Sequence, residues 1–280
     1  MQIVEKNILT PISKGRIVKL KLFAPQIAQK AKPGQFVVLM VTKEGERIPL
    51  TIADTDKNTI TIIFQEVGLT TTFLGRLGKK DSLYALVGPL GNPTEIQKYG
   101  KVIMVGGGVG IAEIYPVIKA FKNVGNYIIS ILGARTKNLL ILEKEIKKFS
   151  DEFYVTTDDG SYGQKGFVLD ILKNLLNKNL SEDEYQLIYA VGPIPMMENV
   201  ANLTKSYNIK TIVSLNALMV DATGMCGCCR VTVGGKTKFS CIDGPEFDAH
   251  QIEWGELAKR NNVYREKENH ICKLLLKLEQ

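Results

Sequence analysis

The first third of the chain alternates hydrophobic and polar residues with the period of two that is typical of half-buried β-strands. Short β-branched runs are separated by turn-forming residues, as at Pro33-Gly34 and around Asn58. The expected strands are residues 3–9, 16–23, 36–41, 50–54, 59–65 and 83–87, and one helix is expected over residues 70–77. Many short strands in so short a segment predict a small antiparallel β-barrel over residues 1–97.

From Lys101 onward, short apolar strands alternate with segments whose apolar residues recur at helical spacing. The expected strands are residues 102–105, 128–132, 153–157, 187–191 and 211–215, and the expected helices are residues 111–121, 139–149, 167–176 and 196–207. This alternation predicts an α/β domain with a parallel sheet over residues 98–217. Residues 218–280 form a third part, a cysteine-rich domain with a helical tail.

Composition narrows the function classes. The chain has no run of the ~18 apolar residues that a membrane span needs. Residues 1–10 lack the layout of a signal peptide, so we expect a cytoplasmic protein that does not enter a membrane. The net charge of +7 is spread over isolated lysines, which favours an acidic partner or a phosphate-bearing cofactor and argues against nucleic acid.

Four of the five cysteines lie within residues 219–241. Four residues separate Asp221 from Cys226, two separate Cys226 from Cys229, and eleven separate Cys229 from Cys241. With cysteine in place of Asp221, this would be the plant-type spacing for a [2Fe–2S] cluster. Because a carboxylate oxygen can bind ferric iron, the spacing predicts a cluster held by Asp221, Cys226, Cys229 and Cys241.

Two other interpretations of these cysteines remain open. A four-thiolate zinc site could use Cys228 as well as Cys226, Cys229 and Cys241, but it leaves Asp221 unexplained, and adjacent cysteines suit a tetrahedral ion poorly. A disulfide is disfavoured in a reducing compartment. Under the cluster hypothesis Cys228 is not a ligand, and Cys272 in the leucine-rich tail is structural.

Residues 106–110 form a glycine-rich loop after the first strand of the α/β domain. Its backbone N–H groups and the following helix N-terminus would suit the pyrophosphate of a dinucleotide. The strict G-x-G-x-x-G pattern fails at Ile111, and tight packing is the alternative explanation. Residues 158–161 and Gly192-Pro193 close later strands, and the carboxyl ends of parallel strands are where such sheets bind ligands.

Two segments of the barrel also suggest a phosphate-bearing ligand. In residues 47–51, Arg47 could clamp a phosphate and Thr51 could donate its hydroxyl to the edge of a flavin ring. Residues 68–72 open the predicted barrel helix, whose backbone N–H groups could hold another phosphate. A solvated arginine and an ordinary helix cap are the alternatives.

Together these segments resemble the ferredoxin–NADP reductase superfamily across essentially the whole chain. Residues 47–51 are similar to its flavin signature, and residues 106–112, 159–161 and 192–197 to its nicotinamide signatures. The trailing cluster domain is similar to electron-transfer subunits of dihydroorotate dehydrogenase. Asp221 in the first ligand position, with residues 243–248, is more similar to the small subunits of bifurcating NADH-dependent reduced ferredoxin:NADP oxidoreductases, also called sulfide dehydrogenase beta subunits.

The resemblance implies FAD in the barrel, NAD(H) or NADP(H) on the α/β domain, and hydride transfer to flavin N5. Electrons would then pass through the cluster to a larger flavin/iron–sulfur subunit in a heterodimer, with ferredoxin reached through the complex. The implied flavin contacts are Arg47, Pro49, Leu50, Thr51, Gln65, Glu66, Val67, Gly68, Thr70, Thr71 and Thr72. The implied nicotinamide contacts are Gly107, Gly108, Val109, Gly110, Ile111, Ala112, Asp159, Gly160, Gly192, Pro193 and Met196.

Other positions qualify the resemblance. Glu113 stands where the family often has proline, and Val191 stands where it often has a cysteine near the nicotinamide. Arg135 could contact a 2′-phosphate or could simply lie exposed. No side chain is expected to act as an acid or a base. The alternatives are the dihydroorotate dehydrogenase subunit and a non-enzymatic redox-sensing or zinc-binding protein on the same scaffold.

Overall fold

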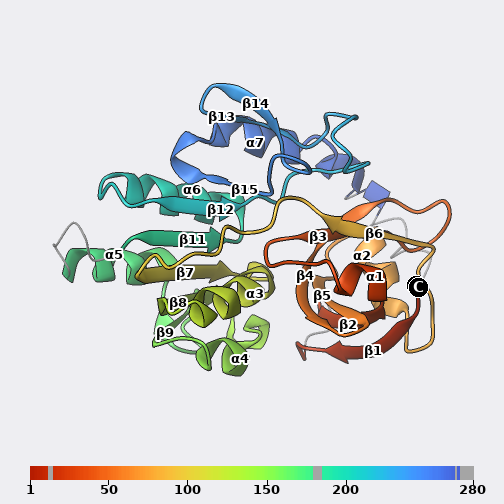
Figure 1. Ribbon diagram of the computed structural model, residues 1–280, viewed down its shortest axis with the longest axis horizontal. Coiled ribbons are helices and arrows are strands. Elements are labelled where there is room, and N and C mark those ends of the chain that lie inside the picture. Colours follow the sequence, from red (N-terminus) through yellow and green to blue (C-terminus); the bar gives the residue numbers. More distant parts are fainter. Residues whose placement is uncertain (12–14, 179–184, 269, 272–280) are drawn as a thin grey trace.

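The computed structural model describes residues 1–11, 15–178, 185–268 and 270–271. Two β-sheets lie side by side, and the cysteine-rich region packs along one edge of the larger sheet (Figure 1). Cys272, expected to be structural, lies outside the described residues. Among the described residues, no helix has both the length and the apolar character that a membrane span requires.

The first sheet has six antiparallel strands in the order β1-β2-β5-β4-β3-β6. The strands are β1 (Ile3–Ile8), β2 (Ile17–Phe23), β3 (Phe36–Met40), β4 (Ile48–Asp56), β5 (Thr59–Gln65) and β6 (Ala85–Leu90), joined by α1 (Pro25–Ala28) and α2 (Leu69–Arg76). Side chains that alternate along β2 and β5, such as Leu20, Leu22, Ile60 and Ile62, are fully buried in its core. The period-two pattern therefore located this sheet correctly.

The two edge strands of this sheet do not pair along their lengths. Backbone hydrogen bonds instead join the start of the chain to the segment that leads into β6, from the Ile3 N–H to the Asp81 carbonyl and from the Leu83 N–H to the Met1 carbonyl, each 2.8 Å long. An isolated bridge between Gln2 and Ser82 lies between them. The expected barrel is thus a curled sheet whose edges are tied at one end, without a continuous closing ladder.

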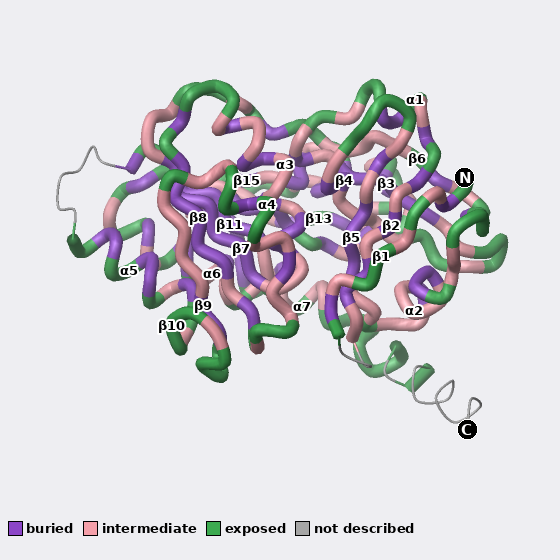
Figure 2. The backbone as a smooth tube through the Cα atoms, turned by 90° about the horizontal axis from the view of Figure 1, so that it is seen from below, coloured by how far each residue is buried: buried purple, intermediate pink, exposed green. Residues whose placement is uncertain are grey.

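The second sheet has the order β10-β9-β8-β7-β11-β12-β15 and is parallel except for β15. Its strands are β7 (Lys101–Gly107), β8 (Tyr127–Ala134), β9 (Glu152–Thr157), β10 (Gln164–Lys165), β11 (Leu187–Val191), β12 (Thr211–Ser214) and β15 (Glu246–Asp248). Its helices are α3 (Gly110–Asn123), α4 (Glu143–Lys147), α5 (Val168–Lys178) and α6 (Ile194–Lys205). Alternate residues of β7 enter two different hydrophobic clusters, one with α3 and the other with α5 and α6. Figure 2 shows this burial along β7, β8 and β11.

Two features differ from the sequence-based expectation. The helix expected over residues 139–149 is a 3₁₀ turn, η1 (Lys137–Leu139), followed by the short α4, because Leu142 between them has a positive φ of 53°. The strand β15 was not expected at all. It lies after the cysteines and adds antiparallel to β12, so residues expected to form the third part extend the nucleotide sheet.

The rest of the cysteine-rich region is built on a hairpin and a helix. The hairpin consists of β13 (Arg230–Val233) and β14 (Lys236–Phe239), and η2 (Ala249–Gln251) and α7 (Trp254–Asn261) follow β15. The buried Trp254 indole N–H donates to the Ala249 carbonyl at 3.2 Å. These elements place Cys229 and Cys241 beside the core of the larger sheet.

Candidate functional site

The order of the parallel strands reverses at β7, with β8 and β9 on one side and β11 and β12 on the other. Open α/β sheets bind ligands outside the carboxyl ends of their strands at such a switch point. The glycine-rich loop after β7 and the Gly192-Pro193 loop after β11 both lie there. The topology therefore brings together two of the segments that the sequence analysis singled out.

The glycines of these loops have different roles. A Cβ on Gly110 would lie 2.6 Å from the backbone carbonyl oxygen of Val191, so Gly110 lets α3 begin directly against β11. Cβ atoms on Gly107 and Gly192 would collide with Met196. Gly108 has a φ of +58° and would meet no atom within 4 Å. Packing explains the other three glycines, and Gly108 leaves open space beside the N-terminus of α3, where a pyrophosphate fits.

The loop after β9 is hydrogen-bonded to the loop after β8. The Asp159 carboxylate accepts from both the hydroxyl and the backbone N–H of Ser161, and these bonds lower its pKa. The Ser161 hydroxyl in turn accepts from the Lys137 N–H at 2.9 Å. Arg135 lies exposed in the same pair of loops. Asp159 therefore shapes the loops at the carboxyl ends of β8 and β9, where Arg135 also lies.

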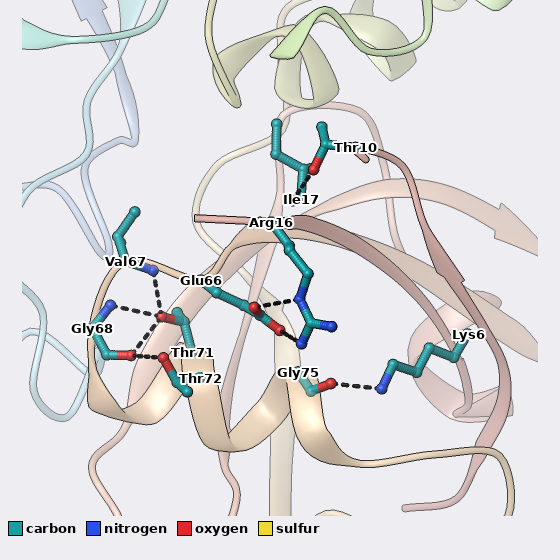
Figure 3. Close-up of polar contacts among 10 residues, drawn as sticks. All are labelled: Lys6, Thr10, Arg16, Ile17, Glu66, Val67, Gly68, Thr71, Thr72 and Gly75. Carbon is teal, nitrogen blue, oxygen red and sulfur yellow. Dashed lines mark hydrogen bonds and ion pairs between the residues drawn. The ribbon is translucent and has the colours of Figure 1, made fainter. Parts of the chain in front are cut away.

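On the flavin side, several of the side chains expected to contact the cofactor bond to the protein itself (Figure 3). Glu66 forms a bidentate ion pair with Arg16, with both N···O distances 2.8 Å. The Thr71 hydroxyl accepts from the N–H groups of Val67 and Gly68 at 3.1 and 3.0 Å. Gln65, Thr70 and Thr72 bond to Gly15, Glu46 and Gly68. These contacts fix the turn before α2 and occupy the N–H groups of Val67 and Gly68.

The start of β4 offers side chains for a ligand. Arg47 is exposed, and among the described residues it makes no ion pair or hydrogen bond. Pro49, Leu50 and Thr51 are half-buried on β4. Helix α3 packs across this strand, and Asp54 on β4 pairs with Lys119 on α3 at 2.9 Å. The segment expected to bind flavin therefore meets the helix that follows the glycine-rich loop.

Sequence reasoning noted Glu113 only as a departure from proline and gave it no role. Its side chain is half-buried at the start of α3, where burial raises the pKa of the carboxyl to about 7 and Thr51 acts in the opposite direction. The sequence did contain a signal for this residue, because Glu113 is an acidic residue among the apolar residues at the start of α3.

The four expected cluster ligands form two pairs. The Cys226 thiol lies 3.2 Å from the Asp221 carboxylate, and the sulfurs of Cys229 and Cys241 are 3.2 Å apart. The first pair is exposed or half-buried and the second is fully buried. Cys228 belongs to neither pair, because its sulfur faces the Cys226 carbonyl oxygen at 4.0 Å.

This arrangement fits a binuclear cluster better than a single ion. In a [2Fe–2S] centre each iron takes two protein ligands, so two ligand pairs are what the group needs. A zinc site would require four side chains to converge. Within the described parts of the chain, no three His, Cys, Asp or Glu side chains converge in that way. The four-thiolate zinc alternative is disfavoured because Asp221 pairs with Cys226 while Cys228 lies outside both pairs.

The electrostatics of the two ligand pairs differ. Burial, together with the neighbouring Cys229, raises the pKa of Cys241 to about 12, so this thiol stays protonated until a metal displaces the proton. Hydrogen bonds from the backbone N–H of Thr223 and from Cys226 lower the pKa of Asp221, which is ready to bind as a carboxylate. When a cluster binds, Cys241 must therefore lose its proton against the effect of burial, whereas Asp221 binds as the carboxylate it already is.

The loop between the pairs is held by a residue that sequence reasoning missed. The Arg260 guanidinium on α7 donates to the carbonyls of Cys228 and Gly227 at 3.0 and 3.4 Å. Met225 at the tip of the loop is 88% exposed, and Val220 and Ile242 are also exposed. The cysteine loop is thus anchored from behind and presents apolar side chains outward.

Comparison with known proteins agrees with this geometry. The iron–sulfur cluster binding domain of dihydroorotate dehydrogenase B matches residues 216–253, and an oxidoreductase NAD-binding domain matches residues 104–202. A Thermotoga maritima homologue of the dihydroorotate dehydrogenase B electron-transfer subunit is 46% identical, over 91% of this chain and 90% of its own. The Fusobacterium nucleatum subunit is 34% identical, over 84% of this chain and 92% of its own.

A solved structure of an NADH-dependent reduced ferredoxin-NADP oxidoreductase is also similar. It superposes with a TM-score of 0.90 and 43% identity, and the match covers 98% of this chain and 97% of that chain. An Amycolatopsis cytochrome P450 reductase, 21% identical with a TM-score of 0.61, shares the fold over 74% of this chain and 65% of its own. The expected superfamily resemblance is confirmed, and the chain belongs to the family of electron-transfer subunits that includes those of dihydroorotate dehydrogenase B.

Proposed function

We propose that this chain transfers electrons between NAD(H), FAD and a [2Fe–2S] cluster and delivers them to a larger flavin/iron–sulfur subunit. The observation that carries the proposal is the pairing of Asp221 with Cys226 and of Cys229 with Cys241. The second pair is packed into the core of the sheet that bears the nucleotide loop. A two-electron site and a one-electron site are therefore parts of one folded unit.

Each group has its own set of residues in this proposal. The open side of Gly108 and the N-terminus of α3 hold the pyrophosphate of NAD(H), with Asp159 and Met196 shaping the site. Arg47 binds an FAD phosphate, and Thr51 lies at the flavin ring. When bound, FAD accepts a hydride and gives up its electrons singly. The protein positions these two groups from β4 and α3, which pack against each other.

We assign the complex to the bifurcating NADH-dependent reduced ferredoxin:NADP oxidoreductase type. Asp221 in the first ligand position supports this, together with the 43% identity to a solved chain of that enzyme. We place the partner on the face formed by residues 219–229 and 241–247, where Val220, Met225 and Ile242 are exposed beside the ligands. An exposed apolar patch at a redox centre is suited to docking of an electron acceptor.

Activity measurements with and without a partner test this proposal. The purified chain, loaded with FAD and cluster, should reduce artificial acceptors with NADH, because the flavin and nicotinamide sites are both internal to it. It should not couple ferredoxin to NADP until the larger subunit is added. Full ferredoxin-dependent activity from this chain alone would contradict the proposal. Dihydroorotate oxidation by the complex purified from the native host would instead favour the alternative that several relatives' names suggest.

A further inference from the structure

A few buried polar side-chain atoms have no hydrogen-bond partner in the part of the chain that the structure describes, and two of them belong to the cysteine-rich region. They are the Ser240 hydroxyl oxygen and Arg260 Nε, and both groups can donate a hydrogen bond. The other two, on Thr59 and Thr156, lie on β5 and β9. Because a buried donor without a partner loses its hydration uncompensated, each such group calls for an explanation.

Ser240 lies directly opposite the proposed ligand Cys229 in the hairpin of the cysteine-rich region. The register of β13 and β14 pairs Arg230 with Phe239, and its continuation by one residue pairs Cys229 with Ser240. The Ser240 N–H donates to the Cys229 carbonyl at 3.0 Å, in agreement with this pairing. Directly opposite side chains of an antiparallel pair project from the same face. The Ser240 hydroxyl and the Cys229 sulfur therefore lie on the same side of the hairpin.

That side of the hairpin faces the core of the protein. Cys229 and Val231, on this face, belong to a large hydrophobic cluster, whereas Arg230 between them is exposed. Ser240 is fully buried, and the Cys229 sulfur lies 3.2 Å from the Cys241 sulfur. The Ser240 hydroxyl is therefore enclosed next to the buried ligand pair, and it has no acceptor among the described residues.

We propose that the Ser240 hydroxyl donates a hydrogen bond to a sulfur of the [2Fe–2S] centre, the Cys229 thiolate or an adjacent sulfide, and thereby raises the reduction potential of the cluster. This inference rests on the ligand set proposed above. The sulfur of a protonated cysteine is only a weak acceptor, whereas a metal ligand is a thiolate and carries negative charge. Deprotonation of the ligands thus supplies the acceptor that the Ser240 hydroxyl lacks.

The sign of the effect follows from the charge of the centre. An added electron makes the cluster sulfurs more negative, so a hydrogen bond to sulfur is stronger in the reduced state than in the oxidised state. The hydroxyl therefore stabilises the reduced state more, while its own proton stays on the oxygen. Cys226 in the other ligand pair is exposed, and water can solvate its sulfur. Ser240 supplies this stabilisation at the buried pair and makes the cluster a better acceptor for single electrons.

Redox titration of the chain loaded with FAD and cluster, followed by electron paramagnetic resonance, tests the proposal. S240A removes the hydroxyl and should lower the potential of the cluster, whereas S240T keeps a hydroxyl and should restore most of the loss. T156V is the matched control, because it removes another buried hydroxyl without a partner, on β9, and should leave the potential unchanged.

Resonance Raman spectra provide a readout that does not depend on electron transfer. Transfer of the wild type to deuterated water should shift an iron–sulfur stretching band, and the shift should be smaller in S240A. A shift of a terminal band would identify the Cys229 thiolate as the acceptor, and a shift of a bridging band would identify a sulfide.

Equal potentials in the wild type and S240A would overturn the proposal, as would an equal fall of the potential in S240A and T156V. If S240A folds but takes up no cluster, a cluster in S240T would support the role of the hydroxyl. Failure of both variants to take up a cluster would give Ser240 a packing role and would overturn the proposal. Absence of bound iron from the wild type would show before any titration, and would refute the proposed function and this inference with it.

Discussion

The nucleotide loop after β7 and the cysteine loop at residues 219–229 are both glycine-rich, yet they are built in opposite ways. The first lies between parallel strands, and a Cβ on Gly110 would press on the backbone of Val191 at 2.6 Å. The second projects from the fold, and its Met225 is 88% exposed. Arg260 and the Asp221 carboxylate supply the hydrogen bonds that hold it.

The difference separates two ways of making a ligand site. Close packing around Gly107, Gly110 and Gly192 determines the shape of the loop after β7 without any ligand. The cysteine loop holds its ligands as two separate pairs, and an iron–sulfur cluster would join them. Arg47 resembles the cysteine loop in this respect: it is exposed, and among the described residues it makes no polar contact that would fix it without a ligand.

The largest effect is expected from removing one buried ligand. Cys229→Ser should abolish or badly destabilise the cluster, because this sulfur is enclosed beside Cys241 and serine is a poor substitute for a thiolate. Visible absorption and iron content measure the loss. Cys228→Ser is the matched control and should leave the spectrum intact. Loss of the cluster in Cys228→Ser, with retention in Asp221→Ala, would overturn the ligand assignment.

The next effect concerns Arg47. Arg47→Ala removes charge-assisted hydrogen bonds to phosphate, each contributing about 1.5–3 kcal/mol. FAD affinity should therefore fall ~10- to 100-fold or more, which flavin content after gel filtration would reveal. Lys43→Ala removes another exposed cation four residues earlier and should not change the flavin content. Equal flavin content in the wild type and Arg47→Ala would count against this phosphate site.

A smaller effect, on the free energy of unfolding, should distinguish glycines that pack against other atoms from glycines that do not. Gly110→Ala places a methyl group against the Val191 backbone, and overpacking of this kind lowers the free energy of unfolding by about 1–3 kcal/mol. Gly255→Ala on α7 meets no atom within 4 Å and should raise it by about 0.5–1 kcal/mol. Chemical denaturation of the cofactor-free chain compares them. If both substitutions changed the free energy of unfolding by the same amount and in the same direction, the packing argument would be contradicted.

The smallest expected change is at the exposed ligand pair. Asp221→Cys should keep a cluster, because the loop already places this side chain 3.2 Å from the Cys226 sulfur. The reduction potential should shift, since a thiolate and a carboxylate donate different electron density to iron. Redox titration followed by electron paramagnetic resonance measures the shift. An unchanged potential would show that Asp221 does not bind the metal.

Much of the fold could be predicted because its signals are local. Alternation located all six strands of the first sheet, and the change to helical spacing after Lys101 marked the parallel sheet. The strand β15 could not be found in this way, because three residues carry no periodicity and their partner β12 lies some thirty residues earlier. The left-handed Leu142, which interrupts the expected helix, has no local sequence signal.

In the candidate site, too, local sequence signals were predictable and contacts between distant segments were not. Spacing indicated Asp221, Cys226, Cys229 and Cys241, and the structure brings them together in pairs. Contacts between distant segments could not be predicted from spacing: Arg16 with Glu66, Arg260 with the cysteine loop, and Lys119 with Asp54. Each depends on chain folding that brings a lone polar residue to a partner far away in the sequence.

Anaerobic addition of NADH to the chain loaded with FAD and cluster, followed by absorbance and electron paramagnetic resonance, tests the central claim most directly. The account predicts that the flavin absorption bleaches and that the signal of a reduced [2Fe–2S] cluster then grows within the same protein. In Cys229→Ser the bleaching should persist without the cluster signal. Flavin bleaching in the wild type with no cluster signal, or a cluster signal that persists in Cys229→Ser, would contradict the account.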